Sequence, residues 1–166
     1  METQVKPQNN RFLKSTIITG VIILLWVLWR IILPNQPTIF AGSQPNNIGI
    51  INNQLASCPI SPNCVSSFSK DAQHYIAPIN YHTTEKDTFE QLTKVINSLE
   101  RTKIITVKDN YLYVQFTSFL MGYVDDVEFL LDESKKVINV RSASRIGESD
   151  LGVNKQRIET IRKQIN

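Results

Sequence analysis

Charged side chains gather in two short blocks near the C-terminal end of the sequence. The set is Asp125, Asp126, Glu128, Arg141, Arg145, Asp150 and Arg157. Asp126 and Glu128 are two residues apart, so in a strand their carboxylates face the same side. Two such carboxylates suit acid–base or metal-assisted hydrolysis, provided that a nearby arginine does not neutralise them.

Two further interpretations of this charged set remain open. Acids and bases occur in nearly equal number, which favours an ion-pair network joining the second predicted hairpin to the last helix. Alternatively, Arg141 and Arg145 could bind an anion at the start of that helix, although Asp150 is placed to occupy this positive end itself. The catalytic residues stay unknown from sequence, and we expect no cofactor and no metal ion.

Cys58 and Cys64 enclose a short loop that is stiffened by two prolines. In an oxidising compartment they are expected to form a structural disulfide, worth on the order of 2 kcal/mol for so small a ring. A zinc site with His74 and His82 would have unusual ligand spacings. A nucleophilic cysteine would need an activating partner that the sequence does not place. Both histidines are expected at the surface.

The net charge of +3 belongs to the N-terminal end. Residues 1–33 hold four basic residues and one acidic residue, and the remaining 133 residues hold 14 of each sign. A neutral body lacks the field that drives binding to a phosphate backbone, so nucleic acid is not an expected partner.

An apolar stretch over residues 15–33 has the length of a membrane-spanning helix. At ~1.5 Å per residue it reaches about 28 Å, close to the ~30 Å hydrocarbon core. Trp26, Trp29 and Arg30 lie near one end, as interfacial residues do. Basic residues precede the stretch, which predicts residues 1–14 as a cytoplasmic flank. The domain is then periplasmic, lumenal or extracellular.

We interpret this stretch as an uncleaved signal anchor whose partner is the lipid bilayer. A cleaved signal peptide is the alternative, because small residues follow at 41–43, although far beyond the apolar stretch. A buried globular helix is disfavoured because the stretch has no polar face. Residues 34–54 are uncharged and rich in Pro, Asn and Gln, which predicts a flexible linker before a domain at 55–166.

The domain shows a helix, then strands, then a helix. Thr84 and Asp87 resemble a capping box that opens a helix ending near residue 100. Strand patterns follow at residues 103–107, 111–117, 124–131 and 137–144. A last helix begins near residue 150, with Leu151 on its buried stripe. This order predicts an α+β fold: a four-stranded antiparallel meander with two helices on one face, plus the N-terminal transmembrane helix.

The register of the second hairpin follows from its alternation of apolar and charged residues. Opposed positions whose numbers sum to 269 place Leu131 against Ile138 and Glu128 against Arg141. A shift by one residue would mix the two faces. In the connection before this hairpin, Phe119, Leu120 and Met121 either fill the core or form a patch for a protein partner or the membrane.

Four blocks of sequence, taken in order, resemble a known family. They are residues 58–67, 125–129, 141–147 and 149–154, the last followed by Arg157. Over about residues 55–166 the chain resembles domain-of-unknown-function family 1499, whose members often follow a signal or anchor segment. Glu148 and Lys155 depart from the pattern. The resemblance implies no particular activity, substrate or cofactor.

The sequence therefore predicts a membrane-anchored, non-cytoplasmic protein of unknown biochemical activity. We expect a non-enzymatic binding or assembly module of the cell envelope or thylakoid. The alternative is a hydrolase-like enzyme or an anion-binding domain that uses Asp126, Glu128, Arg141 and Arg145.

Overall fold

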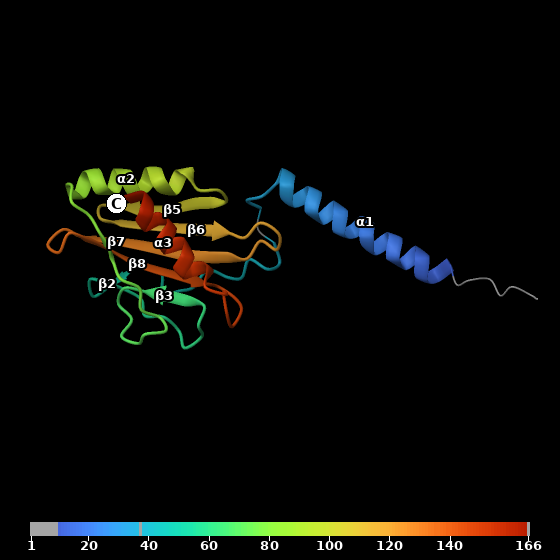
Figure 1. Cartoon of the computed structure of the whole chain (residues 1–166), viewed down its shortest axis with the longest axis horizontal. Helices are drawn as coiled ribbons and strands as arrows, with labels where there is room; N and C mark the ends of the chain where they lie inside the picture. Colours follow the sequence, from blue (N-terminus) through green and yellow to red (C-terminus); the bar gives the residue numbers. More distant parts are fainter. Residues whose placement is uncertain (1–9, 37, 166) are drawn as a thin grey trace, which may run out of the picture. The chain divides into compact units, whose positions relative to one another are not determined.

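The computed structural model describes residues 10–36 and 38–165. The chain divides into two compact units, Met1–Pro34 and Asn35–Asn166, and Figure 1 follows the chain through both. The first unit holds one long helix, α1 (Asn10–Ile32). Helix α1 begins before the expected apolar stretch, because Arg11 and Lys14 are good helix formers although they are polar.

The apolar part of α1 ends in a cluster of polar and aromatic contacts. Arg30 donates from Nη2 to the carbonyl oxygen of Pro34 at 2.8 Å, which satisfies a carbonyl beyond the last turn. The rings of Trp26 and Trp29 lie with centroids 5.3 Å apart. An 18-residue window of the helix has a mean hydropathy of 2.1, and the length and composition of the helix fit a membrane anchor or a signal sequence.

The second unit is an α+β domain. Its strands are β1 (Ile50–Ile51), β2 (Gln54–Leu55), β3 (Cys64–Ser66), β4 (Ile79–Asn80), β5 (Thr102–Lys108), β6 (Tyr111–Thr117), β7 (Val124–Asp132) and β8 (Val137–Ser144). Its helices are α2 (Glu85–Ser98) and α3 (Val153–Ile165). The expected order of helix, strands and helix is therefore present, with shorter strands added before it.

The main sheet of the described residues has six strands, not the four expected. Its order is β3-β8-β7-β6-β5, and β4 also pairs with β8. The four expected strands do form an antiparallel meander, β5–β6–β7–β8. The sheet is larger than expected because β3 and β4, with three and two residues, are too short to show an alternating pattern. Both cover the edge of β8 that the meander would leave open. The expected β7–β8 register is confirmed, with Leu131 opposite Ile138 and Glu128 opposite Arg141.

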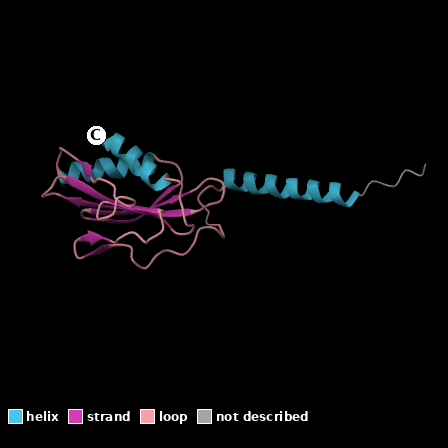
Figure 2. Ribbon diagram, turned by 60° about the horizontal axis from the view of Figure 1, so that its bottom comes forward, coloured by secondary structure: helices cyan, strands magenta, loops and turns pink. Residues whose placement is uncertain are grey.

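Helices α2 and α3 lie on the same face of the sheet (Figure 2). Leu92 and Ile96 of α2 and Ile158 and Ile161 of α3 pack there against Val127, Phe129 and Leu131 of β7. The side chain of Thr84 accepts a hydrogen bond from the Asp87 amide, which caps α2 as expected. Leu151 is not part of this core: it precedes α3, has a positive φ of 54° and is 94% exposed.

The other face of the sheet is covered by residues 38–55, here called the cover segment. Leu55 of this segment is buried against Tyr111, Tyr113 and Leu130, and Ile48 packs on the same cluster. Strands β1 and β2 form a tight hairpin. Its turn residues, Asn52 and Asn53, both have positive φ, as a two-residue hairpin turn requires.

The cover segment meets the β6–β7 connection at its first residues. Thr38 donates from Oγ1 to the carbonyl oxygen of Met121 at 2.7 Å. Gly122 has a positive φ of 73°, and a Cβ atom there would lie 2.5 Å from Cγ2 of Thr38. The rings of Phe40 and Tyr123 pack edge to face. The segment expected to be a flexible linker thus makes specific contacts with the domain from Thr38 onward.

Candidate functional site

Strand β7 carries acidic side chains on both faces of the sheet. Because side chains alternate along a strand, Asp126 and Glu128 face the cover segment while Asp125 faces α3. Each of the three is paired with an arginine. These three ion pairs, together with Asn154, are here called the charged array.

The pair formed by Asp126 and Arg145 is buried and has two contacts. Nη2 of Arg145 donates to Oδ1 of Asp126 at 2.8 Å, and Nε donates to Oδ2 at 2.9 Å. The side chains are 1% and 8% exposed, so solvent screens the pair very little. Tyr113 also donates from its hydroxyl to Oδ1 at 2.6 Å. Arg145 reaches the cover segment as well, through the Gly42 carbonyl oxygen at 3.4 Å.

Glu128 and Arg141 are direct cross-strand neighbours on β7 and β8. Nη1 of Arg141 donates to Oε2 of Glu128 at 3.1 Å, and both side chains are buried. The other carboxylate oxygen, Oε1, accepts from the Tyr111 hydroxyl at 2.8 Å and from the Gly49 amide at 2.7 Å. Nε of Arg141 is buried without a hydrogen-bond partner among the described residues.

On the helix face, Asp125 accepts a hydrogen bond from Nη2 of Arg157. Nη1 of Arg157 donates to the Ser142 hydroxyl at 3.0 Å, and its guanidinium lies 4.6 Å from the ring centroid of Phe116. A cation over an aromatic face gains further attraction. Arg157 therefore joins α3 to β6, β7 and β8.

Asn154 is a buried junction that the sequence did not reveal. Its Nδ2 donates to the carbonyl oxygen of Asn63 and to the Ser144 hydroxyl, each at 3.0 Å. Its backbone amide donates to Oδ2 of Asp150 at 2.8 Å, so Asp150 caps α3. Asp150 therefore belongs to the helix start, and no ion pair in the described chain includes it.

Both tyrosines on the cover side have raised pKa values. Burial raises the pKa of Tyr113 to about 12, and the hydrogen bond to Asp126 adds to the shift. Burial and then the charge of Glu128 raise the pKa of Tyr111. Both phenols therefore stay protonated and act as donors to the two carboxylates. Tyr111 and Tyr113 are two residues apart on β6, as Asp126 and Glu128 are on β7. This shared spacing was the pattern in the sequence that could have placed the two tyrosines beside the two carboxylates.

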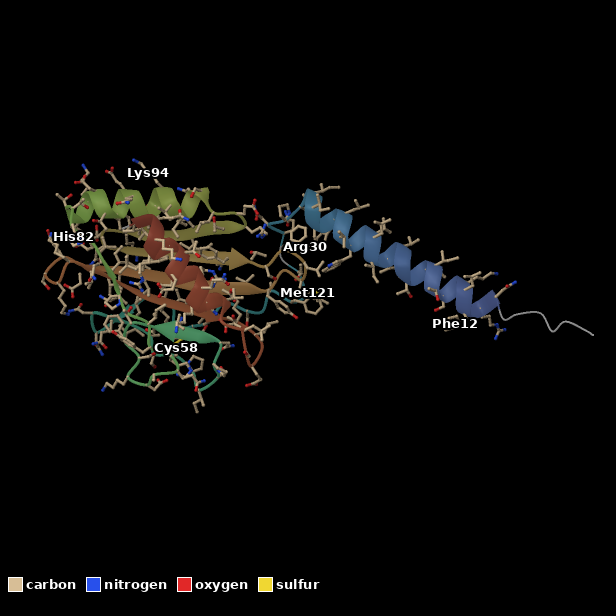
Figure 3. All side chains as sticks on the ribbon, in the orientation of Figure 1. Phe12, Arg30, Cys58, His82, Lys94 and Met121 are labelled. Carbon is tan, nitrogen blue, oxygen red and sulfur yellow. A yellow bond between two sulfur atoms is a disulfide. The ribbon has the colours of Figure 1, made fainter. Side chains whose placement is uncertain are left out.

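The expected disulfide is present between Cys58 and Cys64, with an S–S distance of 2.06 Å, and Figure 3 labels Cys58 near β3. Neither sulfur is then a free thiolate for zinc or for nucleophilic attack. His74, expected at the surface, is buried, and its Nδ1 pairs with Oδ1 of Asp71 at 2.7 Å. His82 is exposed, and Figure 3 shows it at the end of the domain where α2 begins.

The apolar connection between β6 and β7 does not fill the core. Phe119 and Leu120 are 42% and 50% exposed, and the Phe119 ring lies 5.7 Å from the guanidinium of Arg101. Met121, labelled in Figure 3, is half-buried. Of the two expectations for these residues, an exposed patch fits better than a core plug.

Residues 54–165 match the family described as "Protein of unknown function (DUF1499)". Because the match covers more than half of the chain, the protein belongs to this family. The matched region holds every ion pair of the charged array, but it excludes Gly42 and Gly49 of the cover segment. A comparison with curated proteins found no match.

Proposed function

We propose that the protein is a non-enzymatic binding or assembly module held by α1 in a membrane of the cell envelope or thylakoid. The bilayer is then the partner of residues 15–33, and the domain lies on the non-cytoplasmic side. The basic residues ahead of the helix support this orientation. The Cys58–Cys64 disulfide supports an oxidising compartment.

The observation that carries the proposal is the state of Asp126 and Glu128. Their side chains are 1% and 0% exposed. Every carboxylate oxygen accepts a hydrogen bond from the protein itself. A general acid or base must reach the proton that it transfers, and these groups are enclosed. The geometry therefore favours a structural role over the hydrolase-like alternative.

The anion-binding alternative is disfavoured for the same reason. Arg145 donates from Nε and Nη2 to Asp126 and from Nη1 to the Gly42 carbonyl oxygen. Arg141 is 3% exposed beside Glu128. Neither guanidinium presents an open fork to a phosphate or carboxylate. A protein partner instead has an exposed apolar contact available at Phe119 and Leu120, next to Met121.

The test uses full-length protein in detergent, wild type and the variants Asp126→Asn and Asp109→Asn. We expect no turnover of ester, phosphate or peptide substrates, and a large loss of stability for Asp126→Asn alone, since Asp109 is exposed. Turnover that Asp126→Asn abolishes while the unfolding midpoint stays unchanged would contradict the proposal. In cells, Cys58 and Cys64 should resist alkylation until they are reduced. Ready labelling of unreduced protein would contradict the exported location.

A further inference from the structure

A cavity of about 530 Å³ opens where three turns meet at one end of the sheet. They are the turns of the β1–β2, β5–β6 and β7–β8 hairpins, and Figure 1 shows β2 and the β7–β8 turn at the same end of the domain. The volume is typical of sites for small molecules. No residue of the charged array lines this cavity.

Part of the cavity lining is apolar. Leu130 of β7, 6% exposed, lies there with the half-buried ring of Phe68. Ile50 of the β1–β2 hairpin adds aliphatic surface at the side. A surface of this kind gains free energy by covering C–H groups of a ligand, and an aromatic ring offers a flat face for them.

Uncharged amide side chains line the walls. They are Asn52, Asn53, Gln54 and Asn139. None of these four side chains makes a hydrogen bond to another residue within the part of the chain that the structure describes. Each amide offers two donors and an acceptor. Asn110 is fixed in place by donating from Nδ2 to the Leu131 carbonyl oxygen at 2.8 Å.

Three carboxylates at the rim, those of Glu85, Asp132 and Glu133, affect the charge of the ligands that the cavity can bind. Asp132 is compensated by Lys135, whose Nζ donates to it at 2.9 Å. Glu133 pairs more loosely with Lys136, whose Nζ lies 3.9 Å from Oε1. Glu85 has no ion pair among the described residues, and burial and the charge of Glu133 raise its pKa. The carboxylates at the rim therefore outnumber their lysine partners by one, and an anionic ligand would meet repulsion there. The site therefore suits a neutral ligand with polar edges and apolar faces.

We infer that this cavity binds a short neutral saccharide. The C–H face of a sugar ring would lie on Phe68 and Leu130, and its hydroxyl groups would exchange hydrogen bonds with Gln54 and Asn139. This inference rests on the proposed non-enzymatic binding function, because it gives that module a class of ligand. It does not depend on the charged array.

The test is a calorimetric titration of the full-length protein in a zwitterionic detergent, which carries no sugar headgroup. The probes are cellotriose, maltotriose and chitotriose as neutral trisaccharides, and trigalacturonate as an anionic one. We expect saturable binding of at least one neutral probe and none of trigalacturonate. Gln54→Ala and Asn139→Ala should each weaken binding roughly threefold to tenfold, the loss of about one hydrogen bond. Asn97→Ala, at an exposed amide on α2, should bind like wild type.

Three results would overturn the inference or its ligand class. Failure of all three neutral probes to bind overturns the inference, as does equal affinity in the Gln54→Ala and Asn139→Ala variants. Gln54 is exposed on the hairpin, so its variant is not expected to disturb folding. Binding of trigalacturonate alone overturns the ligand class. Mass spectrometry of the titrated probe separates the two proposals, because cleavage would support the ligand class but contradict the non-enzymatic function.

Discussion

Asp126 and Arg145 form a two-point ion pair inside the domain, at 2.8 and 2.9 Å. Glu128 and Arg141, on the same face of the sheet, meet through one contact at 3.1 Å. The planar guanidinium fork is needed for the first geometry but not for the second, where a single donor suffices. Two arginines that look equivalent in the sequence therefore hold their carboxylates in different ways.

This difference predicts unequal effects of a conservative exchange. Arg145→Lys loses one of two donors to a buried carboxylate, so we expect the free energy of unfolding to fall by roughly 2–3 kcal/mol. Arg141→Lys keeps a donor for Glu128 and removes the unpartnered Nε, so a fall of about 1 kcal/mol is expected. Denaturant unfolding followed by circular dichroism measures both. Equal losses would contradict the assignment of the two-point pair.

The raised pKa of Tyr113 predicts a loss of stability at high pH. Its pKa rises from 10.0 to about 12 on folding, so the folded state holds the phenol proton more tightly than the unfolded state does. The contribution of this proton to the free energy of unfolding is fully present below pH 10 and is lost as the pH rises towards 12. Tyr113→Phe should flatten this part of the profile. Unfolding midpoints measured between about pH 8 and about pH 12 test this, and parallel profiles for the wild type and Tyr113→Phe would contradict the prediction.

Reduction of the Cys58–Cys64 disulfide should destabilise the domain modestly. The bridge closes a ring with a sequence separation of 6, and chain entropy for so small a ring is worth about 2 kcal/mol. The Cys58→Ser, Cys64→Ser double variant should match the reduced wild type, which a thermal melt with and without reductant tests. A melt that reductant leaves unchanged would mean that the bridge does not constrain the unfolded chain.

Gly122→Ala should weaken the contact between the cover segment and the β6–β7 connection. The new Cβ would meet Thr38 at 2.5 Å and would also sit at positive φ, so we expect a loss of roughly 2–3 kcal/mol. Gly147→Ala is the matched control: its φ is also positive, but its Cβ would meet only the Ser149 carbonyl at 4.0 Å. It should cost about 1 kcal/mol. Similar losses in the two variants would show that Thr38 does not pack against Gly122.

The long elements were predictable because they repeat a pattern. Strand β7 has nine residues, enough for alternation to fix which side chains share a face and which register β8 adopts. Glu128 could therefore be set opposite Arg141 from sequence. Burial of the pair was not predictable, because it depends on the cover segment, which lies more than 70 residues earlier in the chain. The contact between Gly49 and Glu128, for example, joins residues 79 positions apart.

Contacts made by short strands and by main-chain atoms produce no alternation of apolar and polar residues in the sequence, so they could not be predicted from it. Strands β3 and β4 are too short to alternate. Asn154 is one polar residue in a helix, and its role depends on the distant carbonyl of Asn63. Leu151 was misplaced because its positive φ takes it out of the helical spacing that the apolar pattern suggested.

The cover segment meets the charged array mainly through backbone atoms: the amide of Gly49 and the carbonyl of Gly42. Both glycines have positive φ, and a Cβ atom at residue 42 would lie 2.9 Å from Cγ2 of Ile146, so these two positions favour glycine. The neighbouring side chains of the cover segment take no part in these two hydrogen bonds, so substitutions there should leave both in place as long as the two glycines are kept. A pattern of shared residues would then begin late, as the family match does at residue 54. The region that matches the family is therefore shorter than the stretch of chain that encloses the buried charges.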